Sequence, residues 1–331
     1  MYWPKIRVCD NKKSFQNFLV KHCMVHYKSA KPLYLAGGLT EDPDKCTVIS
    51  AGEVKEAQAY RASHEEADDR IMLNIQQLYI KTSKSGTVTV VTPDADIFVV
   101  LMYHLKNTWR GLSLHLLKKG QITMPKKPQK ELYPLHLLIL KLDPKVIDQL
   151  PAGHSLTGCD TVAKVGTKKS LLNVLESFDP LITDFGREAL DGDMIRYAEQ
   201  FLIKVIAKKY QDCPTFDELR VKLYHHQSKD KRFIDLPCSS STIHDNIRRA
   251  FLQTKLWLDS PFLNAAETME FQDYGYVCHL NENLIVPKLD DVVKPLDVPE
   301  PCKCTTCVKR TCTCRVEKIP CSVFCGCAGG F

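Results

Sequence analysis

The chain has 331 residues, of which 44% are hydrophobic and 25% charged, and its formal net charge is +6. This composition is typical of a globular protein with one large core or two domains. No apolar run approaches the roughly eighteen residues that a membrane-spanning helix needs, and the N-terminus lacks the hydrophobic region of a signal peptide. These features exclude a membrane span, and we expect a soluble intracellular protein.

Up to about residue 150, predicted helices and strands alternate along the chain. Amphipathic or apolar patterns predict helices at 11–27, 63–82, 96–106, 134–142 and 144–150. Short apolar or β-branched runs predict strands at 33–35, 47–49, 87–91, 112–116 and 121–124. The strand at 87–91 is β-branched throughout, so we expect it to be buried. The alternation favours an α/β sheet domain flanked by helices.

Beyond residue 190 the patterns become helical, and a proline-rich stretch with no periodicity then follows. We therefore predict a sheet domain, a helical extension, a linker and a small cysteine-rich tail, with boundaries at 1–190, 191–286, 287–301 and 302–331.

Acidic residues gather at two predicted element ends. Ser63 and Glu66 form a capping box at the start of a helix, with Asp68 in its first turn, and Asp94 and Asp96 follow the strand at 87–91. If that helix and strand are antiparallel neighbours, these carboxylates converge at the sheet edge where α/β folds bind ligands.

A fifth acid, Asp160, follows Gly158 and Cys159 in a predicted turn. Clustered carboxylates repel one another and are tolerable only with a cation among them. Oxygen ligands favour Mg²⁺ or Mn²⁺, and two such ions catalyse phosphodiester cleavage. The lysines that follow the turn, Lys164, Lys168 and Lys169, suit a phosphate backbone.

Each acid also has a plainer explanation. Glu66 could serve only the capping box, Asp68 and Asp69 could favour the helix dipole, and Asp94 could form a turn after Pro93.

Eight of the fifteen cysteines lie in the last thirty residues, at positions 302, 304, 307, 312, 314, 321, 325 and 327. Without a secretory signal, this density favours metal binding over disulfides. So short and apolar-poor a segment needs Zn²⁺ to fold. We predict zinc ligands at Cys302, Cys304, Cys307, Cys312, Cys314, Cys321, Cys325 and Cys327. The tail carries five Lys or Arg and one Glu, which suits a polyanion, although ordinary surface lysines would look the same.

Three motifs, Glu66-Ala67-Asp68, Asp94-Ala95-Asp96 and Gly158-Cys159-Asp160, resemble those of flap endonuclease/XPG-like PIN-domain nucleases. The stretches around them are more similar still to asteroid-like animal proteins tied to mobile elements. The resemblance implies a PIN-like fold with Glu66, Asp68, Asp94, Asp96 and Asp160 as catalytic Mg²⁺ ligands. Family members have a further acid on an earlier strand. This sequence begins after that point, so we expect the first strand to be missing and activity to be reduced or lost.

The tail resembles the tesmin-like CXC module, in which nine cysteines hold three zinc ions and basic side chains contact DNA. The resemblance assigns Lys309, Arg310 and Arg315 to DNA contacts, and it places Gly330 where the ninth cysteine is expected.

Two functions follow as hypotheses. The first is a metal-dependent, structure-directed nuclease acting on DNA, with RNA as a second candidate. The alternative is a non-catalytic nucleic-acid-binding protein derived from a mobile element. A third and less favoured hypothesis is a scaffold protein that binds no nucleic acid. Either of the first two favours a nuclear location.

Overall fold

A computed structural model describes residues 9–63, 67–118, 131–166, 168–177, 182–226, 236–262, 270–279, 284–289, 302–305, 312–316 and 325–327. The chain forms two compact units, Met1–Lys288 and Leu289–Phe331. The described part is mixed α/β, with three small sheets and a cysteine cluster, as the sequence predicts at this coarse level. The predicted linker at 287–301 lies almost wholly outside the described residues.

The first unit begins with a helix and an antiparallel sheet. After α1 (Cys9–His26), the strands β1 (Leu33–Ala36), β2 (Cys46–Ser50) and β3 (Glu53–Glu56) pair in sequence order. Ala51 and Gly52 both have positive φ, 51° and 83°, as a two-residue hairpin turn requires. The predictions of a helix at 11–27 and of strands at 33–35 and 47–49 are confirmed.

A second sheet, with the order β4-β5-β6, carries the acidic stretch. β4 (Gly86–Thr92) runs parallel to β5 (Leu112–Lys118) through the crossover helix α3 (Ala95–Asn107), and β6 (Glu131–Pro134) pairs antiparallel with β5. In the described part β6 therefore takes the place of the predicted partner 121–124, which lies outside it.

The expectation that 87–91 is a buried strand is wrong for burial, although the strand itself is confirmed. Only Val90 and Thr92 are buried in β4, and Val91 is 50% exposed. The cause is the strand order, because β4 has one neighbour, β5, among the described strands. β-branched side chains favour the strand conformation but do not determine how many neighbours a strand has.

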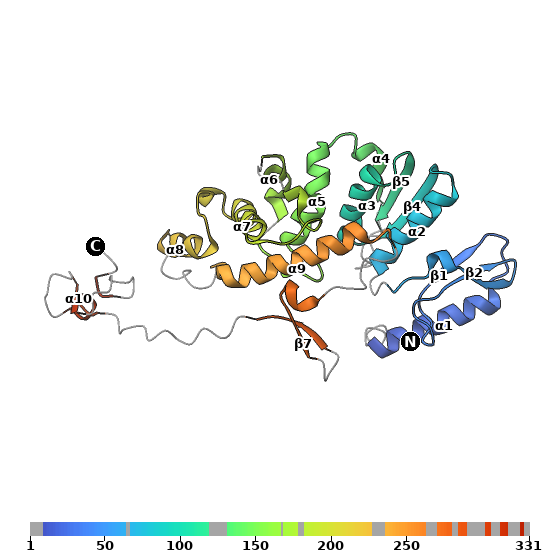
Figure 1. The fold of residues 1–331 in the computed structure, drawn as a ribbon, viewed down its shortest axis with the longest axis horizontal. Helices are drawn as coiled ribbons and strands as arrows, with labels where there is room; N and C mark the ends of the chain where they lie inside the picture. Colours follow the sequence, from blue (N-terminus) through green and yellow to red (C-terminus); the bar gives the residue numbers. More distant parts are fainter. Residues whose placement is uncertain are drawn as a thin grey trace, which may run out of the picture. The chain divides into compact units, whose positions relative to one another are not determined.

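Helices pack around this sheet and extend the core. The remaining long ones are α2 (Ala67–Lys81), α5 (Pro144–Leu156), α7 (Gly192–Ile206), α8 (Phe216–His226) and α9 (Ser240–Asp259), with shorter α4 (Leu135–Leu138) and α6 (Leu171–Ser177) between them. Figure 1 shows α9 running along α5 and α7, which it contacts. Buried side chains from Met72 to Trp257 form one hydrophobic cluster, so the predicted parts 1–190 and 191–286 share a single core.

A buried carboxylate joins three of these helices. Glu199 of α7 is 2% exposed and accepts hydrogen bonds from the Phe216 N–H at 2.7 Å, the Ser240 hydroxyl at 2.8 Å and His244 Nε2 at 2.9 Å. It thereby connects α7 to the starts of α8 and α9.

The first unit ends in a hairpin, β7 (Tyr276–His279) and β8 (Leu284–Pro287), held to α9 by Arg249. Arg249 is 6% exposed, and its guanidinium donates to the carbonyls of Gly275 at 2.9 Å and Lys288 at 3.4 Å. None of the helices in the described part of the chain combines the length and apolar character that crossing a membrane requires.

Candidate functional site

The carboxyl end of β4 presents the first two predicted site residues. Asp94 caps the N-terminus of α3, and its carboxylate accepts a hydrogen bond from the Asp96 N–H at 2.9 Å. The Asp94 N–H in turn donates to the Thr92 hydroxyl at 3.1 Å. Asp94 therefore fills the structural role that the sequence left open for it, and Asp96 follows in the first turn of the helix.

Asp96 is held by a basic pair from other parts of the chain. Its Oδ1 lies 2.7 Å from Nε2 of His154, near the end of α5, and the two side chains are 13% and 7% exposed. The Lys168 ammonium lies 3.0 Å from Nδ1 of the same imidazole. The same ammonium is 3.2 Å from Nε2, so it lies against the ring between the two nitrogens. With the ring proton on Nε2, His154 donates a hydrogen bond to Asp96.

Electrostatics agree with this geometry. Burial raises the pKa of Asp96, but hydrogen bonds from His154 and the Asp160 N–H and the charge of Lys168 outweigh it, so its pKa lies below the ordinary value. Burial lowers the pKa of Lys168, and the charge of Asp96 opposes that shift. The Asp96 charge is thus compensated by a cation of the protein itself.

A closed turn brings Asp160 to this pair. Gly158 has φ +108°, and a Cβ on it would lie 2.5 Å from the Lys164 Cα. The Val165 N–H donates to the Thr157 carbonyl at 3.2 Å, which closes the loop. The Thr161 hydroxyl donates to Gln253 of α9 at 2.5 Å. Only glycine allows the chain to pass itself so closely here.

The predicted acids are only partly brought together. Asp96 and the backbone of Asp160 are in contact, whereas the Asp160 side chain is exposed. Asp68 lies half-buried in the first turn of α2, and Glu66 lies outside the described residues. Within the described ranges, no three of the predicted carboxylates bring oxygen atoms within 4.8 Å of one another.

His154 is the residue that the sequence interpretation did not assign. It lies four positions before Gly158, on the helix that leads into the turn. That proximity to the Gly-Cys-Asp motif is the one signal in the sequence that could have pointed to it.

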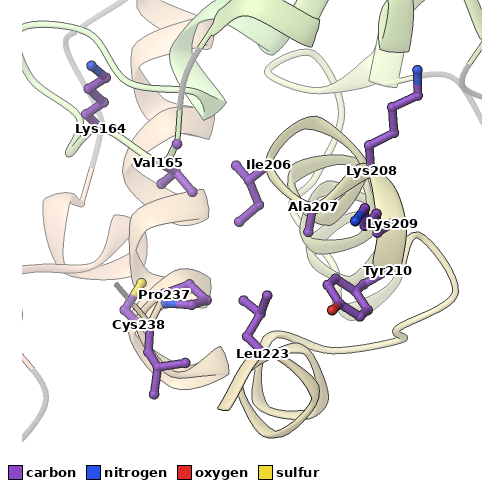
Figure 2. A pocket seen from close by; sticks show the side chains of 12 residues that line it. Lys164, Val165, Ile206, Ala207, Lys208, Lys209, Tyr210, Leu223, Pro237 and Cys238 are labelled. Carbon is purple, nitrogen blue, oxygen red and sulfur yellow. The ribbon is translucent and has the colours of Figure 1, made fainter. Parts of the chain in front are cut away.

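The predicted phosphate-binding lysines adjoin a cavity. Lys164 and Lys169 are exposed, and Lys168 is partly buried against His154. Lys164 also lines a cavity of about 600 Å³, which we call the lysine-rimmed cavity (Figure 2). Its lining consists of Lys164, Val165, Gly166, Ile206, Ala207, Lys208, Lys209, Tyr210, Leu223, Leu236, Pro237 and Cys238.

The second unit contains the cysteine cluster. Two groups of three thiols each have all their Sγ atoms within 4.8 Å of one another. The first consists of Cys302, Cys314 and Cys325, and the second of Cys302, Cys304 and Cys312. Both groups could hold a metal ion, and Cys302 belongs to both. The predicted ligands Cys307 and Cys321 lie outside the described residues, as do Lys309 and Arg310.

Local packing supports a compact thiol cluster rather than disulfides. The sulfur atoms of Cys314 and Cys325 lie 3.5 Å apart, far beyond a disulfide bond length. The Gly326 N–H donates to the Cys302 carbonyl at 2.7 Å, and a Cβ on Gly326 would lie 3.0 Å from the Cys304 carbonyl oxygen. Cys327 is partly buried beside the cluster, and Arg315, in the short helix α10 (Thr313–Val316), is exposed.

Crowding of the thiols changes their chemistry. A backbone hydrogen bond from Cys304 lowers the pKa of Cys302, but burial and the thiols of Cys312, Cys325 and Cys314 raise it above the ordinary value. Thiols this close cannot all ionise unless a cation offsets their charge, and a bound metal ion such as zinc would supply that charge.

Comparison of the chain with protein-family models, with curated proteins and with solved structures found no match.

Proposed function

We propose that the protein binds nucleic acid, DNA in preference to RNA, and that zinc organises its cysteine tail. The observation that carries this proposal is the pair of thiol groups sharing Cys302. Two tetrahedral ions that share one thiolate need seven ligands, and the tail has eight cysteines. A small fold built on zinc, with Arg315 exposed and Lys309 and Arg310 close in sequence, is suited to contact phosphates.

The first unit supports the same proposal with its own basic residues. Lys164 and Lys169 are exposed beside the turn that brings Asp160 to Asp96. The resemblance of the acidic motifs to flap endonuclease/XPG-like PIN proteins, and of the tail to the CXC module, points the same way. A PIN-like sheet and a mobile-element origin belong to this proposal, as does a nuclear location.

Two measurements test the proposal. Elemental analysis of the reduced protein should find about two zinc ions per chain or more, and a protein without zinc would contradict the metal part. Fluorescence anisotropy with labelled DNA should show binding that weakens as salt rises, because each phosphate contact releases a counterion. A flat titration would contradict the nucleic-acid part.

Metal-dependent cleavage of phosphodiesters is a second candidate function. It is favoured by the meeting of Asp94, Asp96 and the Asp160 turn at the carboxyl end of β4, where α/β folds bind ligands. Mg²⁺ or Mn²⁺ at Asp96 would have to compete with His154, whose Nε2 lies 2.7 Å from that carboxylate, and with the nearby positive charge of Lys168. We therefore rank binding above catalysis.

Cleavage assays separate the two candidates. Purified protein is incubated with Mn²⁺ or Mg²⁺ and branched, single-stranded or duplex DNA. Cleavage that disappears in Asp96→Asn, with DNA binding retained, supports the enzyme. Binding without cleavage, unchanged by Asp96→Asn, supports the binding protein.

A further inference from the structure

The lysine-rimmed cavity lies where four segments of the first unit meet. Residues 164–166 follow the Asp160 turn, residues 206–210 lie at the end of α7, and residues 236–238 precede α9, while α8 contributes Leu223. Its volume of about 600 Å³ falls within the range of small-molecule sites. None of the predicted functions assigns a role to it.

The interior of the cavity is apolar and large enough to hold a planar ring. Figure 2 shows Val165, Ile206, Leu223 and Pro237 around the middle of the cavity, with Tyr210 at one side. Unpaired nucleobases bind in such surroundings, where apolar and aromatic side chains replace the neighbours with which they stack in a duplex. The lining therefore suits an uncharged flat group.

The rim, in contrast, is positively charged. Lys164, Lys208 and Lys209 are exposed, and none of the described lining residues is acidic. Figure 2 shows the Lys164 and Lys208 ammonium groups on opposite sides of the apolar interior. A nucleotide within a strand has phosphates on both sides of its base, whereas an anionic lipid has a charge at one end only. Charge on two sides thus favours a nucleic-acid strand over a lipid.

We infer that the lysine-rimmed cavity binds an unpaired nucleotide of a nucleic-acid strand, with the base among the apolar side chains and the flanking phosphates against the lysines. A base within a duplex is stacked on both faces and cannot enter without being extruded. The protein therefore discriminates in favour of single-stranded regions. The inference rests on the proposed nucleic-acid binding and specifies which form of nucleic acid is bound.

The cavity is also connected to the Asp96 site. Lys164 packs against Gly158 at the turn that carries Asp160, and its charge lowers the pKa of Lys168 in addition to the larger effect of burial. A strand seated in the cavity with a phosphate at Lys164 would continue toward Asp160. Base recognition and the acidic turn would then act on neighbouring nucleotides.

The test compares a labelled single-stranded thymidine oligonucleotide with an abasic one of equal length by fluorescence anisotropy at fixed salt. Both have the same backbone charge, so the ratio of their Kd values reports the base alone. Wild-type protein should bind the thymidine strand about tenfold more tightly than the abasic strand. It should also prefer that strand to a blunt duplex, and free thymidine monophosphate should compete only weakly because it lacks one flanking phosphate.

Variants of the lining residues test whether the base binds in this cavity. Cys238→Trp places a large side chain into the cavity from an exposed position and should reduce the ratio to about one. Leu223→Trp, from α8, does the same if Cys238→Trp fails to fold. Lys208→Gln with Lys209→Gln should weaken both strands equally. The matched control is Lys141→Gln with Lys145→Gln, because both lysines are exposed and lie outside the cavity lining. This variant should retain the wild-type ratio of the two Kd values.

The outcomes distinguish this inference from the function on which it rests. Equal affinity for thymidine and abasic strands overturns the inference and leaves nucleic-acid binding intact. An unchanged ratio in both tryptophan variants shows that the base binds elsewhere and also overturns it. If neither strand binds, the proposed function fails and the inference fails with it.

Discussion

Replacement of Gly158 by alanine tests the turn that brings Asp160 to Asp96. The residue has φ +108°, and an added Cβ would lie 2.5 Å from the Lys164 Cα and 3.1 Å from its nitrogen. Both atoms are backbone, so no flexible side chain can move away. Backbone strain costs about 1–3 kcal/mol and overpacking about 1–3 kcal/mol. Gly158→Ala should therefore lower the free energy of unfolding by roughly 2–6 kcal/mol.

Urea unfolding followed by far-ultraviolet circular dichroism measures this loss. The matched control is Gly192→Ala at the start of α7, where an added Cβ meets no atom within 4 Å. That variant should stay within about 1 kcal/mol of wild type. If the two variants differ by less than about 1 kcal/mol at equal denaturant slopes, the turn relaxes easily and the close approach does not hold Asp160 in place.

Three further predictions concern stability and metal content. His104 is 1% exposed and donates from Nε2 to the Trp257 carbonyl at 2.8 Å, and burial lowers its pKa to about 4. As the pH drops, the unfolded state protonates His104 before the folded state does. The free energy of unfolding should therefore fall by up to about 3 kcal/mol between about pH 6.5 and about pH 4. If the urea midpoint of His104→Gln falls as much as that of wild type over this range, the explanation is wrong. Glu199→Gln should lower the free energy of unfolding by about 1–3 kcal/mol, because it weakens three hydrogen bonds at a buried site, whereas Glu188→Gln on the surface should change little. Cys302→Ser should lose at least half of the bound zinc because both thiol groups need Cys302. The control Cys238→Ser lies outside the tail and should retain the zinc of wild type. Equal zinc losses in the two variants would refute the shared-ligand arrangement.

The sequence predicted the elements around the site well. The crossover from β4 to α3 lies where periodicity and β-branched residues indicated, and so does α2. Residues 64–66, at the predicted start of α2, lie outside the described part. Such signals are local, because an amphipathic face or a β-branched run is complete within one segment. The plainer interpretation of Asp94, a turn after Pro93, is also a local property. In the structure Asp94 serves a local role as the N-cap of α3, where it accepts a hydrogen bond from the Asp96 N–H.

What the sequence did not predict depends on residues far apart in the chain. Asp96 and His154 are 58 positions apart, and nothing in either stretch specifies that they meet. The burial of β4 depends on which strands lie beside it. The lysine-rimmed cavity forms only where residues 164–166 and 236–238 meet α8 and the end of α7. The cysteine spacing indicated a metal cluster from the start, whereas the shared position of Cys302 required the folded backbone.

The attachment of the β7–β8 hairpin to α9 also determines how the two units can cooperate. Arg249 and the Gly275 carbonyl hold Lys288, so the chain leaves the first unit at a fixed point. Residues 289–301 then span at most about 45 Å before Cys302. If both units bind nucleic acid as proposed, joining them over so short a distance gives each a millimolar effective concentration for the other's ligand. Weak contacts from each unit would therefore add up to tight binding on a strand long enough to reach both.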